Sequence, residues 1–410
     1  MARKKDVVSV QVGTSKIVLR YPMRDRRLLT WYENQILDKV EACGGFYNGH
    51  AHIDRAHTLE DVFLSHIETT PLEASSKPLA IKQDLVGDLH KKEGPAYSRE
   101  KMTLRMSLAI ERQIALGVTR LDTNIDATPD LPEDGLLAIN IANELKRKYA
   151  PLIKIRIGPT PIFGFKVDAR DKRPRWDVYK EAAAMCDFLS LLPEKDDYPS
   201  AAARDGKVGF KRHIRMGVEL AHELGKEVQF HLDQMNHPDE RGTERFLEML
   251  EGLDQPKMAG GEPACWVIHF ISPSAYGESQ FRRDVDKLLE LNVGIVPAPS
   301  AGLSMRQPRS VLAPSHTSIA RIPELIKMRV PIRLGTDNIE DVFVPYADGD
   351  MLTEIKMAAC ALRVSPPSIW AKLGAGVRLN NVDIDRIGQI LYEERKACRA
   401  WNPGWEPGIE

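Results

Sequence analysis

The sequence predicts an α/β protein whose parallel strands close into a barrel, and three observations support this fold class. Eight short apolar runs end in polar residues, few of them alternate cleanly between apolar and polar positions, and helix-like segments separate most of them. Strands of this kind are buried on both faces, as in parallel sheets. The runs lie at 45–54, 118–126, 153–162, 187–193, 227–233, 265–272, 293–300 and 332–338. Eight such units predict a TIM (β/α)8 barrel, with an open doubly wound sheet as the alternative.

Helical segments between the runs are predicted at 98–117, 136–150, 210–225 and 281–292, and several of them end at Gly or Asn, as helices commonly do. Residues 1–43 form a short N-terminal segment with a predicted strand pair and a helix. The barrel is predicted over 44–365, and a helical C-terminal extension over 366–410. The last ten residues, WNPGWEPGIE, are expected to pack on a surface or on a neighbouring subunit.

Composition excludes several classes of protein. Lys and Arg number 57 against 58 Asp and Glu, giving a net charge of -1, so no nucleic-acid partner is expected. No apolar stretch approaches the roughly 18 residues of a membrane span, and the N-terminus lacks a secretory pattern. The five cysteines form no CxxC pair, which is typical of a reduced, cytoplasmic protein. No GxxxxGK[ST] or GxSxG motif indicates a nucleotide-binding loop or a serine hydrolase.

The strongest chemical signal is a set of imidazoles and one carboxylate at strand ends. His50 and His52 close the first run and point to the same side of a strand. His231 closes the fifth run, His269 lies in the sixth, and Asp337 closes the eighth. In a barrel these groups meet at one mouth. The pattern predicts a site for a divalent metal ion.

The motifs HAHID, FHLD and GTDN, together with the histidine of the sixth run, resemble the amidohydrolase superfamily. Segments 117–130 and 334–359 are similar to its cytosine-deaminase-like branch, which includes the isopropylammelide aminohydrolases, and the likeness covers about 44–365. The resemblance implies that one divalent ion, zinc or iron, is bound by four ligands: His50, His52, His231 and Asp337. It also implies that Asp337 contacts the water at the metal, and that His269 hydrogen-bonds that water or polarises the substrate.

Two features depart from the branch. Cytosine deaminases carry a proton-shuttling glutamate where this chain has Gln234, and an amide cannot carry a proton. We therefore expect Asp337, with His269 or Asp233, to move protons, and Gln234 to bind a ring amide or carbonyl. The second departure is the β-sandwich that many members build from both termini. It is predicted to be reduced or absent here.

Each of several further residues has two possible roles. Arg55 either binds a substrate carbonyl or carboxylate or forms a salt bridge with a neighbouring acid. Asn124 and Asp126 are either substrate contacts or loop caps. Glu194 and Lys195, which follow the fourth run, make a metal site with two ions a minor alternative. The loop at 297–310 either closes over the substrate, through Ser304, Arg306 and Gln307, or is an ordinary surface loop.

The predicted function is hydrolysis of a C–N bond in a small nitrogen heterocycle, pyrimidine- or triazine-like, by metal-activated water. Catalytic roles are predicted for Asp337, His269, Gln234 and Arg55. Hydrolysis of a cyclic amide is the alternative, and a catalytically inactive ligand-binding barrel is a remote one. The partners expected are a small-molecule heterocycle and further copies of the chain in a homo-oligomer, with no membrane.

Overall fold

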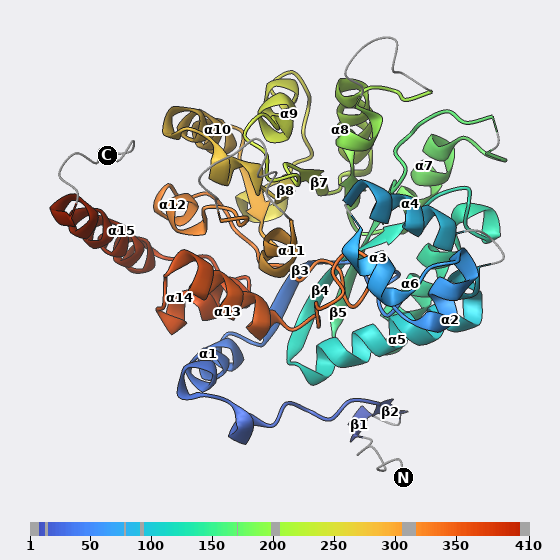
Figure 1. The fold of residues 1–410 in the computed structure, drawn as a ribbon, viewed down its shortest axis with the longest axis horizontal. Coiled ribbons are helices and arrows are strands. Elements are labelled where there is room, and N and C mark those ends of the chain that lie inside the picture. Colours follow the sequence, from blue (N-terminus) through green and yellow to red (C-terminus); the bar gives the residue numbers. More distant parts are fainter. Residues whose placement is uncertain are drawn as a thin grey trace.

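The computed structural model describes residues 8–12, 15–77, 79–90, 94–169, 171–197, 206–305 and 317–401. Its parallel strands lie at the centre, and helices surround them (Figure 1). Seven barrel strands are β3 Phe46–Ala51, β4 Val118–Asp126, β5 Lys154–Thr160, β6 Leu189–Leu191, β7 Val228–Leu232, β8 Cys265–His269 and β9 Val293–Val296. They form two parallel sheets, β3-β4-β5 and β6-β7-β8-β9. Each strand lies within a predicted run.

The eighth run closes the gap between the two sheets without forming a full strand. Isolated parallel bridges join Ile332 to Ile295 of β9, and Asp337 to Ala51 of β3. The Gly49 amide of β3 also donates to the Leu334 carbonyl at 2.8 Å. On the opposite side, the Asp187 amide before β6 donates to the Ile157 carbonyl of β5 at 2.8 Å. The predicted barrel is confirmed, since backbone hydrogen bonds link every neighbouring pair around the ring.

The helices around the barrel include those predicted from the sequence. They are α5 Arg99–Ala115, α6 Leu137–Tyr149, α7 Arg175–Met185, α8 Phe210–Leu224, α9 Gly242–Leu250, α10 Glu278–Glu290, α12 Ile322–Lys327 and α13 Met351–Leu362. α8 shows why the pattern predicts them: one face buries apolar side chains, and Gly225 ends the helix in the left-handed conformation that glycine adopts readily.

The helices of an insertion between β3 and α5 were not predicted from the sequence. It contains α2 Asp61–Leu64, α3 Pro71–Ser76 and α4 Leu79–Leu89. The first two helices are too short to show a clear helical period in the sequence. Two contacts tie the insertion to the barrel mouth: the Lys82 ammonium donates to the Phe343 carbonyl at 3.0 Å, and His90 lies 3.0 Å from an oxygen of Asp126.

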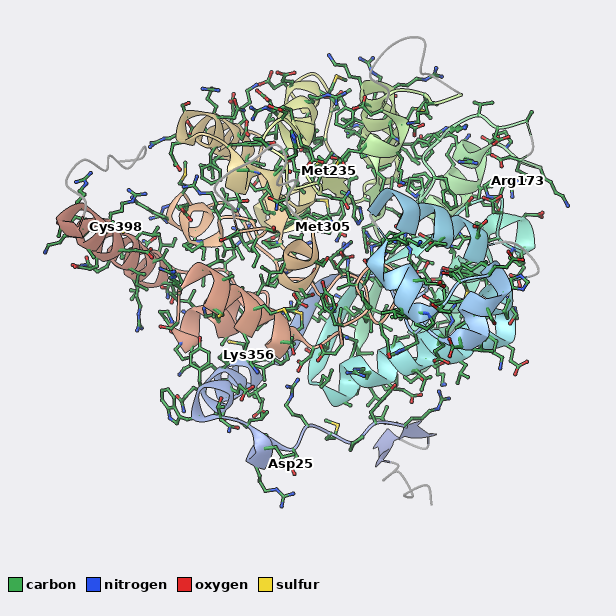
Figure 2. The ribbon with its side chains drawn as sticks, viewed as in Figure 1. Asp25, Arg173, Met235, Met305, Lys356 and Cys398 are labelled. Carbon is green, nitrogen blue, oxygen red and sulfur yellow. The ribbon has the colours of Figure 1, made fainter. Side chains whose placement is uncertain are left out.

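Both ends of the described chain carry elements outside the barrel. Antiparallel strands β1 Val8–Val12 and β2 Ser15–Leu19 precede α1 Trp31–Ala42, which begins at a capping box formed by Thr30 and Glu33. α1 packs against α14 Pro367–Gly374, and the Lys356 ammonium of α13 lies 2.6 Å from Glu33 of α1 (Figure 2). α14 and α15 Asn381–Trp401 complete the described C-terminal region. α15 extends away from the barrel and carries Cys398 near its end (Figures 1 and 2).

Over the described residues, the strands outside the barrel form one hairpin, so the reduced β-sandwich is confirmed for this part of the chain. The tail beyond Trp401 lies outside the described residues. Within the same ranges, no helix has the length and apolar character needed to cross a bilayer.

Candidate metal centre and cleft

Four histidines and one aspartate meet at the carboxyl ends of the barrel strands. His50 lies on β3, His52 just after it, His231 on β7, His269 at the end of β8 and Asp337 at the end of the eighth run. The Nε2 atoms of His50 and His231 are 3.2 Å apart. Asp337 Oδ1 lies 3.4 Å from His50 Nε2 and 3.3 Å from His52 Nε2. The structure thus brings together all five predicted residues.

These separations fit a metal ion. Four ligands with bonds of about 2.0–2.1 Å in tetrahedral geometry place their donor atoms about 3.3 Å from one another. The three distances of 3.2, 3.3 and 3.4 Å match that requirement, and ligand atoms of all three histidines lie within 4.8 Å of one another. His269 Nε2 lies farther out, 3.9 Å from the second oxygen of Asp337. The donor set therefore fits one divalent cation, with His269 beside it.

Burial favours the neutral form of three of these imidazoles, those of His52, His231 and His269, and metal ligation requires that form. The five side chains are nearly inaccessible, with His50 at 0% and none above 4% exposure. Burial, with the Arg55 charge adding to it, lowers the pKa of His52 to about 4. Burial likewise lowers the pKa of His269 to about 4 and that of His231 well below its ordinary value. Burial opposes ionisation of Asp337, but hydrogen bonds with His50 and His52 outweigh it and hold the pKa of Asp337 well below its ordinary value.

A buried amide orients His50. Gln229 Oε1 lies 3.2 Å from His50 Nδ1, and the Gln229 amide nitrogen donates to the Gly49 carbonyl at 3.3 Å. Because that second contact needs the nitrogen, the Gln229 oxygen faces the ring and accepts from Nδ1. The lone pair of His50 is then left on Nε2, directed at the other donors. Partners of this kind fix the tautomer of metal-binding histidines.

Backbone geometry at the strand ends brings the eighth run against β3. A Cβ at Gly335 would lie 2.7 Å from the His50 Cβ and 2.8 Å from its carbonyl oxygen, so only glycine fits there. Two of the site residues have left-handed backbones, with φ of 76° at His269 and 61° at Asp337. Such conformations are costly outside glycine and cluster at functional sites. The fold accepts this strain where the donor atoms converge.

A cleft of about 450 Å³, including space open to solvent, lies over the centre. Its polar lining includes Thr160, Gln234 and Asn338, besides Arg55 and the metal-site residues. Its apolar lining consists of Ile162, Leu192, Met305, Phe343 and Val344.

Comparisons with known proteins agree with this architecture. No protein-family model matches the chain. A curated Haemophilus influenzae protein, named only as uncharacterized, is 24% identical over 298 residues, which are 72% of this chain and 95% of that protein.

Two groups of solved structures share the fold. A 5-methylcytosine deaminase from Klebsiella pneumoniae, liganded with 5-fluorocytosine, superposes with a TM-score of 0.63 at 17% identity, over 84% of this chain and 75% of that one. An N-isopropylammelide isopropylaminohydrolase from Burkholderia multivorans has a TM-score of 0.57 at 16% identity, over 84% of this chain and 82% of that one. The barrel shares the fold of these two enzymes. The predicted resemblance is therefore confirmed at the level of fold.

In this barrel, Arg55 forms the predicted salt bridge with a neighbouring acid, and its contact with a substrate stays a prediction. Its guanidinium forms a bidentate pair with Asp126, whose second oxygen accepts from Arg55 Nε at 2.9 Å. The same side chain lines the cleft and lies over the Phe343 ring. Asp126 is fully buried, so it holds Arg55 in place from behind the cleft.

Gln234 lines the cleft as predicted, and three carboxylates lie behind it. Its amide nitrogen lies 3.4 Å from Glu194 Oε2, and its backbone amide donates to Glu240 at 3.2 Å. Glu194, Asp233 and Glu240 form a group with no member in common with the histidine group. Burial and neighbouring carboxylates raise the pKa of Glu194 well above its ordinary value, and that of Glu240 to about 7. Asp233 accepts backbone hydrogen bonds from Gly242 and Thr243.

The other described candidates are not among the residues that line the cleft. Asn124 is buried and donates to the Ser190 hydroxyl at 2.8 Å. Lys195 follows Glu194 in a short 3-10 turn. Ser304 ends α11 Pro299–Ser304, and its hydroxyl donates to the Ala301 carbonyl at 2.6 Å. Arg306 and Gln307 lie outside the described residues.

Sequence reasoning missed Gln229, Thr160 and Asn338. Gln229 lies two residues before His231 on the same strand face, so the period of the strand was the signal available for it. Asn338 stands in the GTDN motif, directly after Asp337. Thr160 ends β5, at the same mouth of the barrel.

Proposed function

We propose that the protein is a metal-dependent hydrolase that cleaves a non-peptide C–N bond of a small nitrogen heterocycle and releases ammonia or an amine. One observation supports this above the others: the donor atoms of His50, His52, His231 and Asp337 stand at metal-ligand separations beneath a cleft. The solved structures that share the fold include a deaminase and an aminohydrolase of such rings.

The four ligands would hold one divalent ion, zinc or iron. When bound, such an ion lowers the pKa of water toward neutrality and stabilises negative charge that develops on the substrate. Asp337 is ionised and reaches both the ligands and His269, so its free oxygen accepts the proton of the attacking water. The same carboxyl then delivers that proton to the leaving nitrogen.

His269 assists from its place beside Asp337. Its Nδ1 has no partner among the described residues, and its Nε2 faces the second oxygen of Asp337. A neutral imidazole with this orientation holds the proton on the carboxyl between the two transfers. Gln234 cannot take that role, since an amide does not exchange a proton with its hydrogen-bond partner.

The remaining cleft residues bind and orient the ring. Arg55, fixed by Asp126, presents its guanidinium to a carbonyl oxygen or a carboxylate. Ile162, Leu192 and Phe343 supply apolar contacts that exclude water from the ring faces. We propose a pyrimidine- or triazine-like ring as the substrate, a homo-oligomer as the assembly and the cytoplasm as the location.

Gln234 favours a second candidate, hydrolysis of a cyclic amide. It lines the cleft where the related deaminases carry glutamate, and its side chain has both a donor and an acceptor for an amide. In this reaction the ring opens, and the leaving amine stays attached to the product.

The test is release of ammonia or amine from a panel of pyrimidines and triazines by zinc-loaded and iron-loaded protein. We expect turnover that chelation removes and that the same ion restores. Opening of cyclic amides without any free amine would favour the second candidate. Metal-loaded protein that neither releases amine nor opens a ring contradicts both.

A further inference from the structure

The feature that carries a further inference is the side-chain amide of Asn338. Asn338 lines the cleft directly after the metal-site residue Asp337, and it is 5% exposed. Its amide nitrogen donates to Asp341 Oδ2 at 2.5 Å. No partner for its Oδ1 is found among the described residues, and this oxygen is not among the fully enclosed unpaired atoms. The oxygen therefore faces the cleft.

Asp341 fixes which end of the amide faces the ligand. Its Oδ1 accepts from the backbone amides of Phe343 at 2.9 Å and Val344 at 3.0 Å. Its Oδ2 is thereby directed at Asn338, and a carboxylate oxygen can only accept. An Asn338 amide turned by half a rotation would oppose two oxygens. The orientation of the Asn338 amide is thus set by Asp341, which is 1% exposed.

A second residue of the lining, Arg55, has a different polarity. Arg55 carries donors only, and its charge is fixed by Asp126. A ring in the cleft therefore meets a donor at Arg55 and an acceptor at Asn338. A heterocycle with both a ring carbonyl and a neighbouring N–H or exocyclic amino group matches this pair.

We propose that Asn338 Oδ1 selects heterocycles that present an N–H donor to it, with Asp341 as the positioning residue that sets this selectivity. The inference rests on the proposed function, because it assigns the ligand of the same cleft. It excludes rings that are fully N-alkylated or that carry only acceptors at this edge. An isosteric ring without the donor leaves the buried Asn338 oxygen unpaired, which is costly.

The experiment measures binding of matched probes to metal-loaded protein by calorimetry. The probes are uracil and its N,N′-dimethyl derivative, and cyanuric acid and its tri-N-methyl derivative. We expect the wild type to prefer each N–H probe by about tenfold or more, the size of one net hydrogen bond. No binding by either N–H probe, or equal binding within each pair, overturns the inference.

The decisive variant is Asp341→Asn. The asparagine oxygen still accepts from Phe343 and Val344, while its nitrogen replaces Oδ2 and donates to Asn338. The Asn338 amide then reverses and presents its nitrogen to the cleft. We expect the N–H preference to fall by about tenfold, toward equal binding within each pair. A preference unchanged in this variant contradicts the role of Asp341.

Two further variants separate selectivity from folding. Asn338→Leu removes the acceptor at similar size and is expected to abolish the preference without any reversal of the amide. Asp350→Asn changes another buried aspartate, one that caps α13 through the Leu352 amide at 2.9 Å, and is expected to leave the preference unchanged. A loss in Asp350→Asn equal to that in Asp341→Asn would show a structural effect only and overturn the proposal.

The outcome is distinguishable from that of the proposed function. If the probes show the predicted preference and its loss in Asp341→Asn, but no heterocycle releases ammonia or amine, the proposed function fails and the inference stands. If amine is released from a ring that lacks any N–H donor as readily as from its N–H counterpart, the inference fails and the proposed function stands.

Discussion

The two ends of the barrel each enclose a polar cluster, and the clusters differ in how their charges are matched. At the amino ends of the strands, Arg156 lies 2.8 Å from Asp122 and 3.4 Å from Glu227, and Arg333 lies 2.8 Å from Glu227. Tyr47 donates to Asp122 at 2.7 Å. At the carboxyl ends, imidazole nitrogens and one carboxylate face one another. The first cluster is complete within the protein, whereas the second is arranged for a cation.

The buried polar groups at the two ends of the barrel therefore have different roles. The network of Arg156, Asp122 and Glu227 contributes to folding, because breaking one member leaves a buried charge unpaired. The histidine cluster keeps lone pairs directed at a common point, and a bound cation would stabilise it. The predictions that follow test whether stability and metal binding are indeed divided between the two ends.

The largest expected effect is that of His231→Ala at the carboxyl end. Removing one ligand is expected to lower the metal content to a small fraction and the turnover by about 10³-fold or more, since the ion supplies several kcal/mol of stabilisation. Elemental analysis and an amine-release assay measure the two quantities. Full metal content in this variant would show that the histidine cluster is not the metal site.

The opposite end is tested by Arg156→Met. It leaves the buried carboxylates Asp122 and Glu227 short of a partner, so we expect a loss of about 3–5 kcal/mol in the free energy of unfolding. The metal stoichiometry of the folded protein should not change. Denaturant titration gives the first value and elemental analysis the second. A variant that folds normally but loses its metal would break the division between the two ends.

A smaller effect is expected from Gln229→Leu, which removes the acceptor for His50 Nδ1 without touching a ligand atom. The imidazole then loses its fixed tautomer, and we expect metal affinity to fall by about 10–100-fold. Competition with a chelator of known affinity measures the change. An unchanged affinity would mean that packing alone orients His50.

The smallest effect concerns Glu354 on α13, which is buried and accepts from the backbone amide and hydroxyl of Ser300. Burial raises the pKa of Glu354 from 4.5 to about 8. Between these values the folded state holds a proton that the unfolded state has lost, so stability should fall as pH rises from about 4.5 to 8. Glu354→Gln is expected to flatten this part of the stability profile, which denaturant titration over the same range would reveal. An unchanged slope would show that other groups produce it.

The sequence predicted the elements whose physical cause is local. The barrel runs and α8 have periodic apolar positions, and His50, His231 and Asp337 stand at strand ends that the barrel topology brings together. α2 and α3 were not predicted, because a helix of four or six residues completes too few turns to show a period. The insertion that contains them is held by tertiary contacts such as that between Lys82 of α4 and the Phe343 carbonyl.

Contacts between individual side chains could not be predicted from the sequence for another reason. The ion pair of Arg156 with Glu227 and the hydrogen bond that Asn338 donates to Asp341 depend on side-chain orientation. Arg55 shows the limit clearly. Its neighbours in sequence left a salt bridge and a substrate contact equally open, and only the fold places it both beside Asp126 and along the cleft.

The insertion that follows β3 contacts residues next to the cleft at two places. Through His90 it touches Asp126, which holds Arg55, and through Lys82 it holds the main chain at Phe343, beside Asp341. Exchange of this one segment between relatives would therefore alter the donor side and the acceptor side of the cleft together. A new ring preference could arise by such a cassette exchange in a single evolutionary step, while the barrel and its ligand set stayed as they are.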